Sequence, residues 1–396
     1  MIITFFSSKM PRMKINKISS MKKITFVILL CLQSFAQAVV LPVPAAPDVN
    51  AKAYILVDVL TGKVLAEKNS DARIEPASLT KIMTVYVAAH ELRDKNIKLE
   101  DEVLVSEKAW RMKGSKMFLE VKHRVSVDKL LMGIVVQSGN DASIALAEHI
   151  SGTEGTFASL MNLRAQELGM TGTNYINATG WPNSDHYTTA EDLYKLTRAM
   201  ITEFPDIYAR YKTKEYTYGG ITQPNRNSLL WRDESIDGVK TGHTESAGYC
   251  LVSSGVRKGS RLISIVLGSA TKNSRIDASQ SLLNYGFRFF ESHKLKEANK
   301  PLTEAKVWMG IDDTVKLGIE EDLNVVIPRR QYEHLNATMD IESSLMAPIT
   351  AGEIYGTLKV ILNEEEIVSV PLVALEGVEE AGFFKRMTDK VKLMLK

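Results

Sequence analysis

Residues 248–268 have the sequence GYCLVSSGVRKGSRLISIVLG, in which two β-rich runs flank the turn Arg257-Lys258-Gly259-Ser260. Runs of valine, isoleucine and leucine on both sides of a polar glycine turn are typical of a β-hairpin. A second hairpin is predicted far upstream, where residues 54–57 and 64–66 flank a turn at Thr61-Gly62. These hairpins predict one antiparallel sheet built from both ends of a domain.

Mostly helical patterns fill the sequence between the two hairpins. They cover residues 76–92, 127–136, 141–150 and 156–168. Residues 276–290 then close the domain, with Leu282, Leu283, Phe287 and Phe290 at helical spacing. The sequence therefore predicts an α+β domain in which an antiparallel sheet carries a helical insertion.

A second domain is predicted after the polar segment 293–301, which is typical of a linker. Short β-rich runs broken by Gly, Pro and Asn occupy residues 307–375 and indicate an all-β fold. A length of 396 residues accommodates two or three domains, and 45% hydrophobic with 24% charged residues is ordinary globular composition. We place the boundaries at 39–294, 295–376 and 377–396 after an N-terminal segment 1–38.

The net charge of +2 hides an uneven distribution along the chain. Residues 1–38 carry six basic side chains and no acidic one, and residues 381–396 carry five basic against one acidic. The total of +2 therefore leaves −8 for the body between these ends. A folded domain that binds nucleic acid carries its own basic patch, so nucleic acid is not an expected partner.

The basic N-terminal end has the three parts of a secretory signal peptide. Lys22-Lys23 precede a short apolar run, Ile24 to Leu32, and the small-residue site Ala36-Gln37-Ala38 follows. Met21 lies directly before the lysines and is a candidate for the true start. Cleavage after Ala38 leaves Cys250 as the one cysteine, so no disulfide can form within the mature chain.

A candidate nucleophile and its base occur at Ser78-Leu79-Thr80-Lys81, just after Pro76. Proline suits the first turn of a helix, and Ile82, Val85 and Ala89 continue a helical apolar face. Residues i and i+3 are neighbours on a helix, so the hydroxyl and the amine can lie side by side. Lysine can act as a base where burial and positive neighbours lower its pKa from about 10.4.

Two further motifs follow, Ser138-Gly139-Asn140 before a predicted helix and Lys240-Thr241-Gly242 at a strand start. Each motif alone has an ordinary explanation, as a helix-surface pair, a helix cap or the end of an edge strand. Ser126 to Lys129 and Ser269 to Lys272 repeat the first spacing. In this order, however, the three motifs form the set found in serine β-lactamases and penicillin-binding proteins.

Longer stretches around the motifs extend this similarity. Residues 76–81, 138–141 and 237–244 resemble the low-molecular-mass penicillin-binding proteins that are serine-type D-alanyl-D-alanine carboxypeptidases. Residues 177–192 are also similar to that family, although Thr189 to Asp192 could simply cap a helix. The resemblance covers nearly the whole mature chain. It implies a β-lactamase/DD-peptidase-like sheet with a helical insertion, a small all-β domain and a C-terminal amphipathic helix.

The resemblance implies acyl transfer at the D-Ala-D-Ala end of a peptidoglycan stem pentapeptide. Ser78 would attack the carbonyl between the two D-alanines, Lys81 would accept its proton, and Ser138 would relay a proton to the leaving amine. β-Lactams, as mimics of the substrate, would acylate Ser78 and remain attached. The motifs require no cofactor or metal, and the scattered histidines show no zinc-ligand spacing.

The same resemblance implies a set of substrate-binding residues. Asn140 would hold the substrate amide and orient Lys81, and Lys240 would supply positive potential. Thr241 and Arg275 would bind the terminal carboxylate of the substrate. The backbone N–H groups of Ser78 and His243 would form the oxyanion hole. The substrate-binding set is Asn140, Lys240, Thr241, Gly242, His243 and Arg275.

Three alternatives remain open from the sequence. A class A-like β-lactamase shares the motifs, but Glu167 is followed by Leu168-Gly169-Met170-Thr171, which does not match the deacylating motif of that class. A DD-endopeptidase or transpeptidase would use the same acyl-enzyme and differ in its acceptor. A non-catalytic peptidoglycan-binding scaffold would leave the three motifs unexplained.

The basic C-terminal end predicts an amphipathic helix. Apolar residues at three- and four-residue spacing alternate with Lys385, Arg386, Lys390 and Lys392. At roughly sixteen residues with interspersed lysines, such a helix suits the membrane interface and is too polar to span a bilayer. A helix packed on the second domain is the alternative. We expect a protein secreted across the inner membrane and held peripherally on its periplasmic face.

Overall fold

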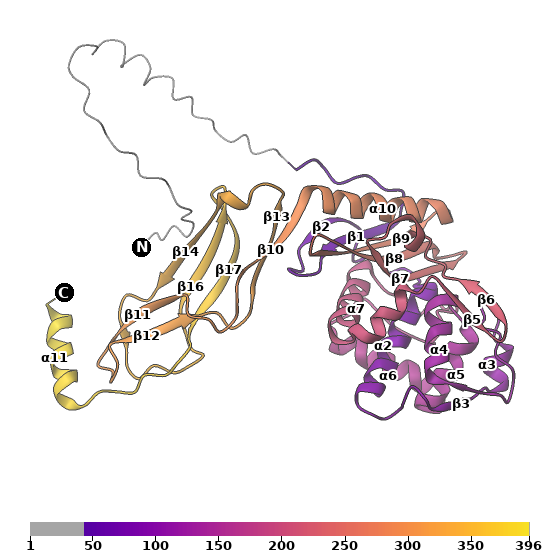
Figure 1. Cartoon of the computed structure of the whole chain (residues 1–396), viewed down its shortest axis with the longest axis horizontal. Coiled ribbons are helices and arrows are strands. Elements are labelled where there is room, and N and C mark those ends of the chain that lie inside the picture. The colour runs from indigo at the N-terminus through magenta and orange to yellow at the C-terminus, as the bar shows by residue number, and fades with distance from the viewer. Residues whose placement is uncertain (1–42, 396) are drawn as a thin grey trace, which may run out of the picture. The chain divides into compact units, whose positions relative to one another are not determined.

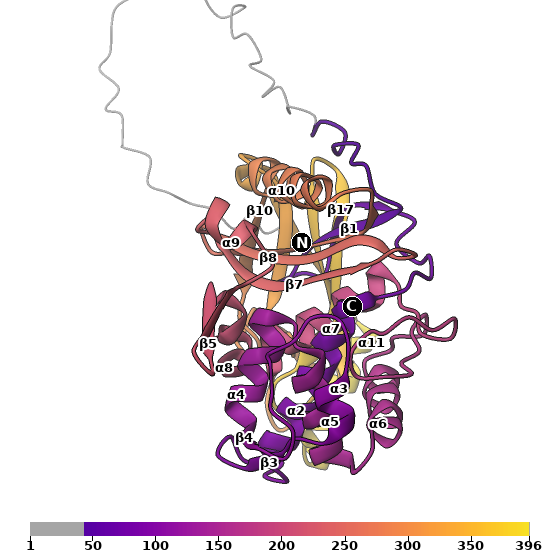
Figure 2. The same ribbon diagram turned by 90° about the vertical axis from the view of Figure 1, so that its right-hand side faces the viewer.

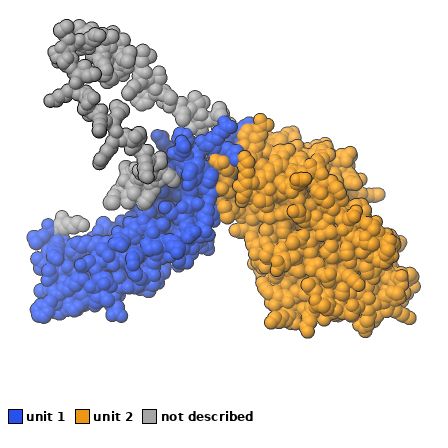
Figure 3. Space-filling model, in the orientation of Figure 1, with its two compact units in different colours: residues 1–44, 293–396 blue, residues 45–292 orange. Residues whose placement is uncertain are grey.

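The computed structural model describes residues 43–395, so the predicted signal peptide at residues 1–38 lies outside the described residues. The chain divides into two compact units, one formed by residues 45–292 and the other containing residues 293–396 (Figure 3). Among the described residues, no helix has both the length and the apolar composition needed to cross a bilayer.

A five-stranded antiparallel sheet organises the first unit, with strand order β2-β1-β9-β8-β7. The predicted hairpins are its two halves, because β1 pairs with β2, β8 pairs with β9, and β9 joins them by pairing with β1. The strands are β1 (Ala53–Asp58), β2 (Val64–Lys68), β7 (Ile236–Thr244), β8 (Gly248–Arg257) and β9 (Ser260–Ser269).

Helices cover both faces of this sheet. Helix α10 (Lys272–Phe289) lies on one face, and the helices inserted between β2 and β7 lie on the other (Figures 1 and 2). All six residues of β1 are buried for this reason. Where α10 crosses the sheet, a side chain at Gly286 would come within 2.5 Å of Leu262, so glycine permits the close approach.

The insertion contains most of the remaining elements of this unit. They are η1 (Ala77–Leu79), α2 (Thr80–Arg93), β3 (Glu102–Leu104), α3 (Glu107–Arg111), β4 (Arg124–Ser126), α4 (Val127–Met132), η2 (Gly133–Gln137), α5 (Asn140–Ser151), α6 (Glu154–Glu167), α7 (Ala190–Glu203), α8 (Pro205–Tyr208), η3 (Ala209–Lys212), β5 (Glu215–Tyr218), β6 (Ile221–Pro224) and α9 (Leu229–Arg232). The helix predicted over 127–136 is instead α4 followed by a π-helical turn, η2, which leads directly into the Ser-Gly-Asn motif.

The second unit is built from strands and one C-terminal helix. A six-stranded sheet has the order β14-β16-β17-β12-β11-β15, and β10 pairs with β13. The elements are β10 (Phe290–Lys296), β11 (Thr303–Trp308), β12 (Thr314–Gly318), β13 (Leu323–Pro328), η4 (Tyr332–His334), β14 (Leu335–Ile341), β15 (Leu345–Met346), β16 (Ile354–Leu362), β17 (Glu365–Ala374) and α11 (Phe383–Met394).

The predicted α+β class, with a helical insertion, a small all-β domain and a C-terminal helix, is confirmed. The interpretation of residues 293–301 as a linker is wrong for its first part, because β10 continues to Lys296. The polar composition of this segment gave no strand pattern, although its backbone groups pair with β13 and its residues are mostly half-buried.

Candidate active site

Ser78 lies in the short helix η1, directly before α2, where the sequence predicted a helix start. Lys81 occupies the first turn of α2, and its Nζ donates a hydrogen bond to Ser78 Oγ at 3.0 Å. The i, i+3 spacing thus brings the hydroxyl and the amine together as expected.

Lys81 is completely buried and has two further partners. Its Nζ donates to Asn140 Oδ1 at 2.7 Å and to the Thr179 backbone oxygen at 2.6 Å. Burial, followed by the nearby Arg226 guanidinium, lowers the pKa of Lys81 from 10.5 to about 7, against the opposite effect of Asp141. The neutral amine is therefore accessible near neutral pH.

Ser138 and Asn140 come from the junction between η2 and α5. Ser138 has a left-handed backbone (φ 62°), and its buried hydroxyl has no hydrogen-bond partner among the described residues. Asn140 Nδ2 donates to the Lys113 backbone oxygen at 2.7 Å, which fixes the amide so that its oxygen faces Lys81. The neighbouring Asp141 accepts the N–H groups of Met117 and Leu119 and holds that loop beside the site.

Lys240, Thr241 and Gly242 lie on β7, the edge strand of the sheet, and are all buried. A side chain at Gly242 would approach the Pro76 backbone oxygen to 2.9 Å and Leu79 Cγ to 3.2 Å, so the glycine lets β7 lie against η1. Burial, and then Lys81, Arg226 and Arg275, lower the pKa of Lys240 well below its ordinary value. An anionic ligand would favour its charged form.

Arg275 projects from the first turn of α10 toward β7 and β8. One guanidinium nitrogen donates to the backbone oxygens of Gly242 at 3.0 Å and Cys250 at 3.3 Å. The guanidinium also lies 5.5 Å from the centre of the Tyr249 ring. Burial lowers the pKa of Arg275 to about 10, which leaves it charged at neutral pH.

A cavity of about 300 Å³ joins these residues. Its lining includes three cations and no carboxylate, which is the electrostatic character expected for an anionic ligand. The lining residues are Ser78, Ser115, Ser138, Arg226, Thr241, Gly242, His243, Tyr249, Lys272 and Arg275. The structure thus brings together every residue that the sequence singled out, with Lys81, Asn140 and Lys240 buried beside the cavity.

Two components of the site carry no sequence signal that could have identified them. Arg226, whose Nε donates to the Gln137 backbone oxygen at 3.3 Å, comes from a polar loop without a motif. The Thr179 carbonyl binds Lys81 through the backbone, and a backbone carbonyl has no residue-type signature. Residues 177–180 were marked only by family similarity, with no role attached.

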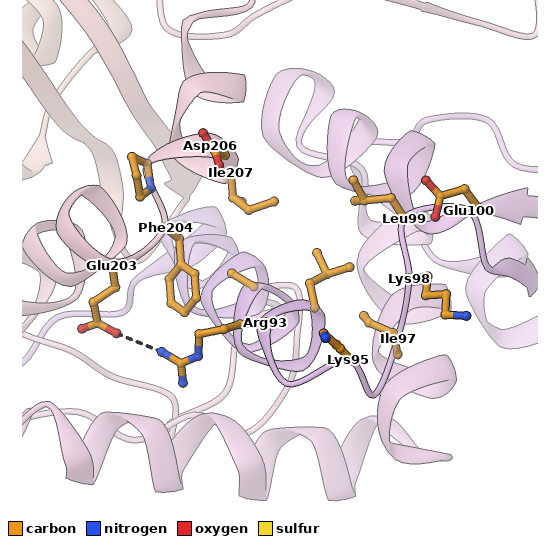
Figure 4. A pocket seen from close by; sticks show the side chains of 13 residues that line it. Arg93, Lys95, Ile97, Lys98, Leu99, Glu100, Glu203, Phe204, Asp206 and Ile207 are labelled. Atoms are coloured by element: carbon orange, nitrogen blue, oxygen red, sulfur yellow. Dashed lines mark ion pairs between the residues drawn. The ribbon is translucent and has the colours of Figure 1, made fainter.

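A larger cavity, of about 450 Å³, lies at the other end of α2 (Figure 4). Arg93 pairs with Glu203 at its edge (3.9 Å), and Phe204 and Ile207 contribute apolar lining. The α2 helix has 14 residues, so this cavity lies about 20 Å from Ser78. It contains no hydroxyl beside a buried amine, and the smaller cavity is therefore the candidate active site.

Comparison with known proteins agrees with this geometry. Residues 42–271 match the peptidase S11 family, described as D-alanyl-D-alanine carboxypeptidase, and residues 290–380 match the C-terminal domain of penicillin-binding protein 5. The chain is 44% identical to D-alanyl-D-alanine carboxypeptidase DacC of Escherichia coli over 356 residues, which cover 88% of this chain and 89% of that protein.

Solved structures show the same relationship. Penicillin-binding protein 5 from Haemophilus influenzae superimposes with a TM-score of 0.83 at 38% identity, covering 85% of this chain and 100% of that one. Penicillin-binding protein D2 from Listeria monocytogenes, in its ampicillin-bound form, has a TM-score of 0.57 at 28% identity and covers 61% of this chain and 100% of that chain.

Proposed function

The chain belongs to the D-alanyl-D-alanine carboxypeptidase family of serine-type hydrolases, and we propose that Ser78 is the residue on which its acyl-enzyme forms. The observation that carries this assignment is the buried Lys81 amine, 3.0 Å from Ser78 Oγ and with a pKa of about 7. A serine hydroxyl is a weak nucleophile until an adjacent base removes its proton. Neutral Lys81 is that base.

The reaction begins when Ser78 Oγ attacks the carbonyl between the two terminal D-alanines and Lys81 takes the hydroxyl proton. The backbone N–H groups of Ser78 and His243 stabilise the oxyanion, an interaction worth on the order of 10²–10³ in rate per donor. Ser138, whose buried hydroxyl has no hydrogen-bond partner within residues 43–395, relays the proton to the leaving nitrogen as the C–N bond breaks. D-Alanine departs, and water then hydrolyses the ester.

Substrate recognition follows from the charge of the cavity. Thr241 and Arg275 bind the free carboxylate of the terminal D-alanine, and this anion favours the charged form of the buried Lys240, which then adds positive potential. A guanidinium matches a carboxylate well in geometry and charge. Because the terminal D-alanine carries a free carboxylate next to the scissile bond, this recognition favours exo-acting cleavage at the end of the stem peptide.

β-Lactams should acylate the same serine, because they mimic the acylated D-alanyl-D-alanine end. A related protein, penicillin-binding protein D2, has been solved with ampicillin bound. We expect a fluorescent penicillin to attach covalently to the wild-type chain and not to Ser78→Ala, as resolved by gel and mass spectrometry. Lys81→Ala should acylate about 10²–10⁴ times more slowly, the range for loss of a general base.

Covalent attachment that persists in Ser78→Ala would refute the assignment of the nucleophile. Product analysis provides an independent test of specificity. A synthetic pentapeptide should release D-alanine, and a cross-linked dimer should be cleaved much more slowly. Preferential cleavage of the dimer would instead identify an endopeptidase.

We also propose that α11 holds the mature chain on the periplasmic face of the cytoplasmic membrane. The helix turns its polar face toward the β domain, where the buried Asp389 accepts the Met309 N–H at 2.9 Å. Its apolar side chains are exposed, with Phe384 at 86% and Met394 at 75%. An apolar helix face directed away from the protein suits insertion into a membrane interface.

A further inference from the structure

The face of η1 and α2 that carries Lys81 is covered by one segment, residues 176–186. Helix positions spaced by three and four residues contact it, namely Ala77, Thr80, Lys81 and Thr84. At the first position the approach is so close that a side chain on Gly180 would lie 1.7 Å from the Ala77 backbone oxygen. At the last, Thr84 Oγ1 donates to the Ala178 backbone oxygen at 2.7 Å.

This segment supplies one of the partners that determine how the Lys81 amine is oriented. A neutral amine has two N–H donors and one lone pair, whereas the ammonium has three donors. If Asn140 Oδ1 and the Thr179 carbonyl take the two N–H groups, the remaining lone pair points toward Ser78 Oγ. The position of the Thr179 carbonyl therefore affects whether Lys81 can receive the Ser78 proton.

The turn that presents this carbonyl is organised by Asn177. Its Oδ1 accepts the N–H groups of Thr179 at 3.1 Å, Gly180 at 2.8 Å and Trp181 at 3.0 Å. Its Nδ2 donates to the Trp181 backbone oxygen at 2.9 Å. One side chain thus cross-links the whole turn, so the attachments of the turn to α2 affect where the Thr179 carbonyl lies.

His186 provides one of these attachments, in addition to Thr84 Oγ1 on the Ala178 oxygen, and its hydrogen bonds identify its tautomer. The Ile176 N–H donates to His186 Nδ1 at 3.1 Å, so Nδ1 carries no hydrogen. Nε2 therefore carries it and donates to Thr80 Oγ1 at 2.8 Å. The ring is 2% exposed, and burial, followed by the charge of Lys81, lowers the pKa of His186 to about 4. The neutral ring that this bonding pattern requires is thus the state present at neutral pH.

We propose that His186 is a positioning residue for acylation: it links the Ile176 end of the Asn177 turn to Thr80, the residue before Lys81, and so holds the Thr179 carbonyl on the amine. This inference rests on the proposed role of Lys81 as the base. Ser78 and Lys81 variants test that role, whereas the experiment below leaves both residues intact.

The test compares Thr80→Val, which removes the hydroxyl with little change of shape, with Thr80→Ser, which retains it. The rate of acylation by a fluorescent penicillin is measured as a function of pH and divided by the number of sites that finally become labelled, which gives a per-site rate. Thr80→Val should acylate roughly 10- to 100-fold more slowly, the range for a displaced catalytic group. Thr80→Ser should restore most of the rate. Thr197→Val is the matched control, because Thr197 is equally buried and its hydroxyl donates within α7, to the Leu193 backbone oxygen at 2.6 Å.

The pH profile separates positioning from a general loss of stability. The charged and titratable groups around Lys81 are Arg226, Asp141, Lys240 and His186. None of these changes in Thr80→Val. Losing the Thr179 acceptor removes a hydrogen-bond partner of the Lys81 ammonium, so the pKa of Lys81 should fall. The acid limb, which is the part of the pH–rate profile where the acylation rate rises with pH, should therefore move to lower pH.

A double-mutant cycle gives the second readout. His186→Asn retains an acceptor for the Ile176 N–H but loses the donor to Thr80, so its rate loss should not add to that of Thr80→Val. Equal per-site rates in Thr80→Val and Thr80→Ser would overturn the proposal. So would a slower Thr80→Val with the acid limb unmoved, or additive losses in the double variant.

Discussion

The Lys81 side chain is fully buried, and its Nζ lies 2.6–3.0 Å from three oxygen atoms. Burial, and then the Arg226 guanidinium, lower the pKa of Lys81, whereas the Asp141 carboxylate raises it. The balance places its pKa at about 7, where the proton can be both taken and returned. Spacing in the sequence identifies the lysine, but the balance depends on groups from distant segments.

Acylation should therefore rise with pH through about 7, because only the neutral amine can accept the Ser78 proton. Arg226→Gln removes a neighbouring cation, so the pKa of Lys81 should rise and the acid limb should move to higher pH. One unit of pKa changes the neutral fraction about tenfold on that limb. The measurement is penicillin labelling against pH.

Arg232→Gln is the matched control for this change. Its guanidinium forms an exposed ion pair with Asp277 at 2.6 Å on α10, and it does not line the cavity. If both variants shift the limb equally, or neither shifts it, the assigned influence of Arg226 on Lys81 is wrong.

Among the elements, the contact between β7 and η1 brings the Lys-Thr-Gly motif to the nucleophile. Strand β7 is an edge strand of the sheet, and its outer side lies against η1 because Gly242 has no side chain. The π-helical turn η2 has a related effect, since it leads the chain into the left-handed Ser138. A simple helix, as the periodicity of residues 127–136 predicted, would continue the helical path past this point.

Gly242→Ala should separate β7 from η1, because the new methyl would lie 2.9 Å from the Pro76 oxygen. We expect a loss of roughly 1–3 kcal/mol in unfolding free energy, as for other overpacked sites, together with slower acylation. Thermal melts and penicillin labelling measure the two effects. Gly155→Ala in α6 is the control, since its nearest neighbour would be 3.9 Å away. An unimpaired Gly242→Ala would show that this contact does not position Ser78.

On the scale of the whole molecule, part of the basic charge at the C-terminal end is paired with acidic side chains. The sequence predicts Lys385 and Arg386 on an amphipathic helix that suits the membrane interface. In the structure Lys385 pairs with Asp313 at 2.9 Å and Arg386 pairs with Glu380. Their charges are thus partly balanced within the β domain, and the exposed apolar face of α11 becomes the main candidate for membrane contact.

A chain that ends at Gly382 should leave the membrane fraction and retain full carboxypeptidase activity. This cut removes α11 but preserves Val378, which is buried and bridges Ile349. A cut at Gly377 would remove that contact as well. Sedimentation with vesicles containing anionic lipid measures the change, and Phe384→Glu in the full chain should weaken binding similarly. Continued sedimentation of the truncated chain would refute the role of α11.

The sequence by itself predicted the α+β class and the family, and it singled out Ser78, Lys81, Ser138 and Lys240 as the proposed catalytic and binding residues. These features depend on local spacing and motif order, which a linear chain records directly. Only the tertiary structure decided three further relations. Arg226 lowers the pKa of Lys81, and the Thr179 backbone oxygen accepts a hydrogen bond from the Lys81 amine. Gly242 allows β7 to pack against η1, which contains Ser78. These relations arise between segments far apart in the chain, through backbone atoms and electrostatic fields that no residue pattern encodes.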